Sequence, residues 1–351
     1  MKQAMNAKYL DVAVGLALLA LLTVAPYFAY PIFLMEVLCF ALFASAFNLL
    51  IGYGGLLSFG HAMFFGLGAY VCAHMLKVGT VFIPFIGTET IGPFGPAGSI
   101  LLGTLAACIL AILTGALAIR RQGIYFAMVT LALSQLVYFM CWQAPFTHGE
   151  DGIQGVPRGA LFGIIDLNKD INLYYVVLAV FAGGLFLIYR TIHSPFGQIL
   201  KAIREDEKRA ISLGYNVDRY KLTAFILSGT LAGLAGATKV LVFKLASATD
   251  IAWQMSGEVV LMTLLGGLGT VLGPSIGAAV IVGLQDNLND MINWLVGALN
   301  ALIHALGSTY TIGPQTDWTL VVQGAIFVVT VMLFRRGIAG EIGALMRRKP
   351  G

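Results

Sequence analysis

The stretch GSILLGTLAACILAILTGALAI, residues 98–119, contains no charged side chain. A bilayer core needs about 20 apolar residues per helix, so this stretch is long enough to cross a membrane. Charged residues make up 11% of the whole chain, against about 25% in soluble domains. Similar apolar runs recur at 10–30, 32–52, 58–77, 98–119, 123–143, 171–190, 222–244, 258–284, 288–306 and 317–334. The sequence predicts an all-α, polytopic integral membrane protein with about ten transmembrane or re-entrant helices.

We expect a single membrane domain over residues 1–351, with larger loops at 144–170 and 191–221. The first run follows two lysines, as a signal peptide would, but it is about twice as long as an ordinary signal-peptide core. We therefore expect a retained first helix. Four cysteines lie inside apolar runs without CxxC spacing, so reduced packing residues are expected: Cys39, Cys72, Cys108 and Cys141.

Basic residues are distributed unevenly between the loops. Arg120 and Arg121 separate two runs, and more Lys and Arg lie in 191–221 and in the carboxyl-terminal tail. Segments 78–97, 245–257 and 285–316 contain neither Lys nor Arg. Because cytoplasmic loops carry the excess of basic residues, both termini and the 191–221 loop are predicted to be cytoplasmic and 144–170 external. The net charge of +4 is then a topology signal and does not indicate nucleic-acid binding.

Each half of the chain contains a glycine-interrupted apolar segment, at 51–70 and at 264–283. One interpretation is close helix packing, because Gly269, Gly273 and Gly277 share a four-residue spacing, as do Gly229 and Gly233. The alternative is a broken helix whose freed backbone groups face a cavity. Under the second interpretation the candidate path residues are Gly60, His61, Gly266, Gly267 and Pro274.

Enzyme signatures such as GxxxxGK[ST], HExxH and GxSxG are absent. The histidines show no metal-ligand spacing, so no catalytic residue, metal site or cofactor is expected in this chain. His61 is expected to bond a backbone carbonyl, with a role in a path as the alternative. Lys239 and Lys244 are expected to extend toward the membrane interface, although Lys239 could instead face a polar cavity.

The stretch SPFGQILKAIREDEKRAISLGYNVDRYK, residues 194–221, concentrates charge in an otherwise apolar chain. Ser194 is a suitable N-cap, Pro195 suits the first helical position, and Gly214 suits a helix stop. Apolar residues recur between them at helical spacing. We therefore predict one short amphipathic helix over 194–214. Its mixed charge favours docking to a protein over binding to anionic lipid, which would select an almost wholly basic face.

Several motifs resemble those of LivM-type permease subunits of branched-chain (hydrophobic) amino acid ABC importers, over nearly the whole chain. They are NLLIGYGGLLSFGHAMFFGLGAY (48–70), GIYFAMVTLALSQ (123–135), EDGIQGVPRG (150–159), the segment from FGQILKAIRED to LAGLAGA (196–237) and SGEVVLMTLLGGLGTVLGPSIGA (256–278). The resemblance implies a bacterial inner-membrane permease that pairs with a second related permease, two cytoplasmic ATPases and a periplasmic solute-binding protein. ATP and Mg would then be bound by the ATPase subunits.

The resemblance also implies that 194–214 is the helix that couples to the ATPase. Glu207, Ala210 and Gly214 look like a loose version of the permease EAA…G motif, with Lys208 and Arg209 where a stricter motif has alanines. The predicted coupling residues are Ile203, Arg204, Glu205, Glu207, Ala210 and Gly214.

Two questions stay open from the sequence. Family members commonly read Thr-Gly-Gly where this chain has Thr147-His148-Gly149, and the solute could be a branched-chain amino acid, urea, an amide or an aromatic acid. The alternative function is a stand-alone secondary carrier or channel. That alternative explains the apolar runs equally well, but not the mixed-charge amphipathic helix or the scarcity of intramembrane carboxylates.

Overall fold

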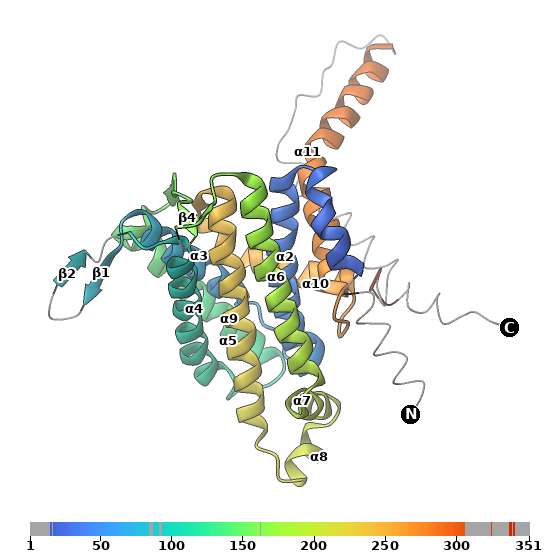
Figure 1. Cartoon of the computed structure of the whole chain (residues 1–351). Helices are drawn as coiled ribbons and strands as arrows, with labels where there is room; N and C mark the ends of the chain where they lie inside the picture. The colour runs from blue at the N-terminus through green and yellow to red at the C-terminus, as the bar shows by residue number, and fades with distance from the viewer. Residues whose placement is uncertain are drawn as a thin grey trace.

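The computed structural model describes residues 15, 17–83, 87–90, 93–161, 163–305, 324, 337, 338 and 340. The principal helices run roughly side by side, with two short helices at one end of the bundle (Figure 1). The helices are α2 (Pro31–Asn48), α3 (His61–Lys77), α4 (Pro96–Ala118), α5 (Ile124–Gln143), α6 (Asp170–His193), α7 (Pro195–Glu205), α8 (Glu207–Ser212), α9 (Val217–Phe243), α10 (Trp253–Gly266) and α11 (Gly273–Ala305). A π-helical turn, η2 (Leu49–Tyr53), continues α2.

Among the described residues, five helices are long and apolar enough to cross a membrane: Pro31–Tyr53, Pro96–Ala118, Ile124–Gln143, Asp170–His193 and Val217–Phe243. They coincide with five predicted runs, so the all-α membrane fold is confirmed. The predicted run 58–77 is the shorter helix α3. Residues Ala17–Tyr27 form a short apolar helix within the predicted run 10–30. The predicted run 317–334 and the basic tail after it lie largely outside the described residues.

α2, α3 and α9 are the core helices of the bundle, and glycines let α3, α4 and α9 approach one another closely. A Cβ on Gly68 would lie 2.4 Å from the carbonyl oxygen of Gly233, and one on Gly233 would lie 2.1 Å from the Cβ of Ala107 in α4. Gly229 meets Ala111 at 2.9 Å in the same way. The predicted packing role of Gly229 and Gly233 is therefore confirmed.

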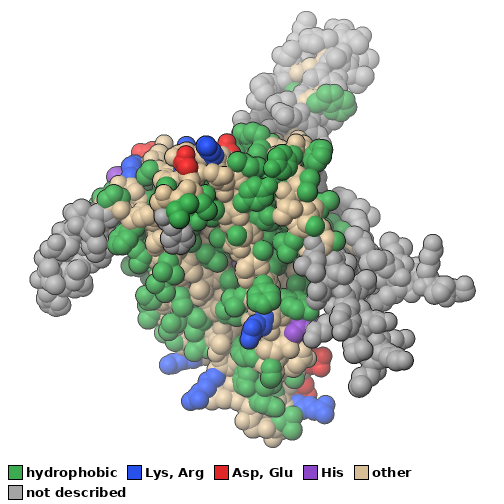
Figure 2. Space-filling view, viewed as in Figure 1, with side chains coloured by type: hydrophobic (Ala, Val, Ile, Leu, Met, Phe, Trp, Pro, Cys, Tyr) green, Lys and Arg blue, Asp and Glu red, His purple; other side chains and the backbone are tan. Residues whose placement is uncertain are grey.

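The peripheral helices present apolar side chains outward. In α2 the most apolar window is 78% buried, whereas the corresponding windows of α4, α5 and α6 are 28%, 33% and 39% buried. Figure 2 shows hydrophobic side chains along the flank and charged side chains concentrated toward the two ends. This distribution matches a bilayer solvent, in which exposed apolar side chains contact lipid tails.

The glycine-rich stretch 258–284 does not form one helix but is interrupted, as the broken-helix alternative allowed. α10 ends at Gly266, and α11 begins at Gly273 and runs without a break through the predicted boundary between 284 and 288. The two helices are antiparallel and in close contact: a Cβ on Gly277 would lie 1.9 Å from the carbonyl oxygen of Met262. With 14 residues, α10 is about 21 Å long, shorter than a bilayer core of about 30 Å. α10 and α11 together form a helical hairpin.

Residues 144–170 form the loop between α5 and α6, at the end of the bundle opposite α7 and α8 (Figure 1). It contains η3 (Pro145–Thr147), β3 (Ile153–Gln154), β4 (Ala160–Leu161) and β5 (Ile165–Asp166), with β4 paired to β5 and β3 paired to β6 (Leu245–Ala246). A further hairpin, β1 (Thr80–Ile83) with β2 (Gly87–Thr90), follows α3. A 3₁₀ turn, η4 (Ala248–Asp250), leads from β6 into α10, and another, η1 (Ala25–Tyr27), precedes α2.

Two residues fix the conformation of this 144–170 loop. His148 adopts φ 60°, the left-handed region that favours glycine, which gives a physical reason for the glycine commonly found there. The buried Arg158 donates to the carbonyl oxygens of Leu241 and Val242 at 2.8 Å and to Asp170 Oδ1 at 2.7 Å. It thereby ties the loop to the last carbonyls of α9 and to the start of α6.

Candidate functional site: the α7–α8 segment and two helix breaks

The predicted amphipathic helix is two helices, which corrects the single helix expected over 194–214. Ser194 caps α7 as predicted, its Oγ accepting from the Gly197 N–H at 3.4 Å, and Pro195 is the first helical residue. The chain breaks at Asp206, whose carboxylate caps α8 by accepting from the Arg209 N–H at 3.1 Å. Gly214 follows α8 with φ 87°, a left-handed conformation that confirms its role as a stop.

One side of α7–α8 packs against the chain's own residues. Ile203 and Ala210 are buried with Val217 in a small apolar cluster. Glu207 forms an ion pair with Lys221 Nζ at 2.8 Å and accepts from Gln122 Nε2 at 2.8 Å. Three predicted coupling residues therefore hold α7–α8 together and fasten it to α9 and to the α4–α5 loop.

The other side of α7–α8 is exposed. Glu205 and Gly214, two predicted coupling residues, lie on it together with the charged Lys208 and Arg209. Ile211 and Leu213 are 56% and 68% exposed, and Tyr215 is exposed beside them. Sequence reasoning missed Leu213 and Tyr215 as surface candidates. They could have been identified from their positions directly before and after Gly214, outside the apolar stripe that the helix buries.

The first helix break lies between η2 and α3. Residues 55–60 are not helical, and a Cβ on Gly60 would lie 2.5 Å from the carbonyl oxygen of Thr130. His61 is fully buried between aromatic rings, and its Nε2 lies 2.8 Å from Ser228 Oγ. The prediction that His61 bonds a backbone carbonyl is therefore wrong. Its partner is the Ser228 hydroxyl, which in turn donates to the Ala46 carbonyl oxygen at 2.5 Å.

The second helix break is the turn between α10 and α11. Gly267 adopts φ 116°, a conformation accessible to glycine. Gly266 packs against the first residues of α11, where its Cβ would lie 2.8 Å from the Pro274 nitrogen. Both interpretations of this segment hold in part: Gly273 and Gly277 pack against α10, whereas Gly269 lies in the turn with φ 75°.

The two breaks meet beside α7. Asn48 Nδ2 donates to the Thr270 carbonyl oxygen at 2.7 Å, and Asn48 Oδ1 accepts from the Gly269 N–H at 3.0 Å. Arg204 Nη1 donates to the carbonyl oxygen of Gly52 in η2. The structure thus brings the predicted coupling residue Arg204 beside Gly269 in the turn that joins α10 to α11. Asn48 was missed, although a polar residue inside an apolar run was the signal that could have identified it.

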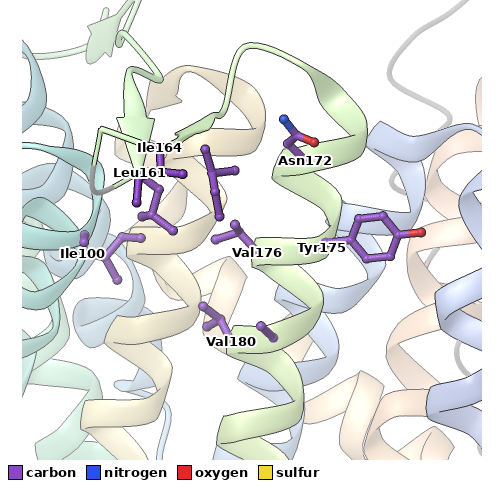
Figure 3. A pocket seen from close by; sticks show the side chains of 10 residues that line it. Ile100, Leu161, Ile164, Asn172, Tyr175, Val176 and Val180 are labelled. Carbon is purple, nitrogen blue, oxygen red and sulfur yellow. The ribbon is translucent and has the colours of Figure 1, made fainter.

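The five predicted path residues are buried within the chain: Gly60, His61, Gly266, Gly267 and Pro274. None of them lines the open groove of about 790 Å³ shown in Figure 3, which lies between α4, α6 and the β4–β5 hairpin. Its wall is mostly apolar, from Ile100, Ile164 and Val176 among others, with Asn172 as a polar group. The path assignment stays a prediction.

Lys239 was expected to extend toward the membrane interface, but it points into the bundle. Its Nζ bonds Asp250 Oδ1 inside the bundle, and its side chain is 14% exposed. Three aromatic rings surround the ammonium group at 5.5–5.8 Å, those of Phe40, Phe65 and Phe243. This pair fixes the start of the α10–α11 hairpin to α9. Within the described residues, no group of three His, Cys, Asp or Glu side chains is arranged to hold a metal ion.

Comparison with known proteins adds to this geometry. The LivM permease of the high-affinity branched-chain amino acid transport system of Escherichia coli (strain K12) is 28% identical over 283 residues, covering 73% of this chain and 63% of that protein. The probable LivM permease of Methanocaldococcus jannaschii is 25% identical over 259 residues, covering 67% and 74%. The ribose import permease RbsC of Bacillus subtilis (strain 168) is 30% identical over 192 residues, covering 53% and 50%. No solved structure matches the chain.

This chain spans less than two thirds of the length of the E. coli relative. The family model described as branched-chain amino acid transport system / permease component matches residues 31–331, which include every helix of the bundle from α2 to α11. Such a component is a membrane subunit and is not itself catalytic. The chain belongs to this family of multi-pass membrane permease components.

Proposed function

We propose that this chain is one permease subunit of an ATP-driven ABC importer, and that a cytoplasmic ATPase moves it through α7–α8. The observation that carries the proposal is the two-sided construction of α7–α8. One side is anchored to the membrane helices through Glu207 and Arg204, and the other exposes Ile211, Leu213 and Tyr215. An exposed apolar centre with charged neighbours suits a protein partner.

This docking surface consists of Ile211, Leu213 and Tyr215, with Glu205, Lys208 and Arg209 around them. Gly214 gives the segment its turn and leaves space, since no atom lies within 4 Å of a Cβ placed on it. A partner groove with an apolar floor and charges of both signs would fit. Ile203 and Ala210 support this surface from within.

The α7–α8 end of the bundle is the proposed cytoplasmic end. The Gln122–Glu207 hydrogen bond brings the loop with Arg120 and Arg121 to this end, so two basic loops lie together there. At the opposite end Arg158 is buried against carbonyl oxygens of α9 and is not a free surface charge. We assign both chain termini to the cytoplasm from the same distribution of basic residues. The membrane in which the chain lies is proposed to be the bacterial inner membrane.

The remaining subunits and the solute are part of the proposal. We expect a second related permease, two ATPase subunits that bind ATP and Mg, and a periplasmic binding protein that delivers the solute. The names of the relatives support a branched-chain amino acid as the solute. Another hydrophobic amino acid, or a related small solute such as urea, an amide or an aromatic acid, is the alternative within the proposal. Lipid surrounds the chain; no nucleic-acid partner is proposed.

The test is purification of the chain from native membranes through an amino-terminal tag, followed by mass spectrometry of what accompanies it. Two ATPase subunits and a second permease are the expected companions. Uptake of radiolabelled leucine, urea and phenylacetate should persist when a protonophore removes the gradient and stop when ATP is depleted. Recovery of the chain alone, in a detergent that preserves a control ABC complex, together with protonophore-sensitive uptake, would support the secondary carrier instead.

A further inference from the structure

Arg204 links α7 to the membrane helices at the point where both helix breaks meet. Its Nη1 donates to the carbonyl oxygen of Gly52, one of the last carbonyls of the helix formed by α2 and η2. A guanidinium suits this place, since helix C-termini carry unpaired carbonyls and negative partial charge. Its Cγ would lie 3.0 Å from a Cβ on Gly55, so glycine leaves room for the side chain.

The same guanidinium lies beside the α10–α11 turn. Arg204 Nη1 would be 3.6 Å from a Cβ on Gly269. Gly52 also contacts the turn, because its Cβ would lie 2.7 Å from the Gly269 nitrogen. The end of the helix formed by α2 and η2, the α10–α11 turn and the end of α7 therefore share one contact region.

Asn48 completes this region. It is buried, and its amide forms one hydrogen bond to Thr270 and accepts one from Gly269, at 2.7 and 3.0 Å. Separating η2 from the turn would leave both amide atoms buried without partners, which is costly away from water. η2 and the turn are thus held as one unit, and Arg204 attaches α7 to it.

We infer that Arg204 and Asn48 are positioning residues that transmit a displacement of α7 to both helix breaks at once. We name Asn48, Gly52, Arg204, Gly269 and Thr270 the break clamp. The inference rests on the proposed function for the force that moves α7. The break clamp explains how one short surface segment reaches the segments at 51–70 and 264–283, which are separated by 194 positions in the chain, from 70 to 264.

The first test compares Arg204→Ala with Arg204→Lys in the reconstituted complete transporter, using radiolabelled leucine and measuring uptake per ATP hydrolysed. Arg204→Ala should lower this ratio about tenfold or more, because a hydrogen bond from a charged donor is lost. Arg204→Lys keeps a charged donor and should recover part of the ratio. Arg190→Ala, which removes an exposed arginine at the end of α6, is the matched control and should leave the ratio unchanged.

A disulfide separates mechanical attachment from a role of the Arg204 charge in docking. Leu200 Cδ1 of α7 lies 3.7 Å from a Cβ placed on Gly54, so the two positions face each other. Gly54→Cys with Leu200→Cys is the pair to oxidise once the native cysteines are replaced by alanine. In the Arg204→Ala background the oxidised pair should restore the ratio, and reduction should abolish it again. If the disulfide forms and the ratio stays low, the break clamp does not act as a mechanical link.

A measurement on this chain alone in nanodiscs does not depend on partners or solute. Spin labels at Gln198 on α7 and at Leu268 in the turn should give a narrow distance distribution in the wild type and a broader one in Arg204→Ala and Asn48→Ala. An equally narrow distribution in both variants would overturn the break clamp. Absence of ATP-dependent uptake in the wild-type transporter, with the narrow distribution intact, would instead overturn the proposed function.

Discussion

Replacing Lys239 by methionine removes the cation of a buried ion pair while keeping most of the side chain's length. Lys239 Nζ bonds Asp250 Oδ1, and the side chains are 14% and 1% exposed. After the substitution, Asp250 would remain buried, and its Oδ2 would still accept the hydrogen bond from the Ser247 N–H at 3.3 Å. The η4 turn that leads into α10 depends on this carboxylate through the Ser247 capping box.

The magnitude follows from the burial. Removing one partner of a buried pair costs about 3–5 kcal/mol because the other charge is left uncompensated. The hydrogen bond from Ser247 offsets part of this cost, whereas loss of the ammonium above three aromatic rings adds about 0.5–2 kcal/mol. We expect Lys239→Met to lower the free energy of unfolding by about 3 kcal/mol or more, a change of about 100-fold in the unfolding equilibrium.

The assay is SDS titration of the purified chain in mixed micelles, followed by tryptophan fluorescence. The double variant Lys239→Met/Asp250→Asn removes both charges and should be more stable than Lys239→Met alone, since no buried charge then lacks a partner. Lys244→Met is the control, the same change at an exposed lysine at the end of α9, with an expected effect below about 0.5 kcal/mol. A Lys239→Met chain as stable as wild type, or a double variant no more stable than the single one, would refute the reasoning.

Three further substitutions test other parts of the structure. Gly277→Ala places a methyl group 1.9 Å from a carbonyl oxygen of α10. It should destabilise the hairpin by about 2 kcal/mol or more in the same SDS titration. Gly257→Ala is the control, because no atom lies within 4 Å of a Cβ placed there, and it should not destabilise the hairpin. Ser194→Ala removes the cap of α7 and should cost about 1 kcal/mol, seen as faster amide exchange in α7; unchanged exchange contradicts the cap. Glu207→Lys puts a second cation against Lys221 and should lower uptake per ATP while the complex still assembles, as judged by co-purification; normal uptake would contradict the coupling assignment.

The membrane fold was predictable from composition and run length. The run 98–119 becomes Pro96–Ala118 and the run 123–143 becomes Ile124–Gln143, because the thickness of a bilayer sets the length of an apolar helix. Local helix boundaries were also predictable, because the Ser194 cap at the start of α7 and the Gly214 turn after α8 depend on the chemistry of one or two residues. The place of the α7–α8 segment therefore followed from sequence.

The partners of the functional side chains were not predictable. Glu207 and Lys221 are 14 positions apart, and Asn48 and Thr270 are 222 positions apart, so neither pairing has a local signal. The same holds for His61, which lies 167 positions from Ser228. Sequence reasoning could name these residues as polar groups in unusual places, but it assigned Glu207 to a partner protein and Lys239 to the interface.

The sequence alone determined that this chain lies in a membrane, where five of its long apolar helices lie, and where a capped, charged segment interrupts them. Tertiary structure decided that 258–284 is broken into a hairpin, that Lys239 points inward, and that both helix breaks meet Arg204. The physical reason is that lipid tails are as apolar as leucine. Hydrophobicity along a membrane helix therefore does not separate the side that contacts lipid from the side that contacts protein, and packing alone fixes which residues meet.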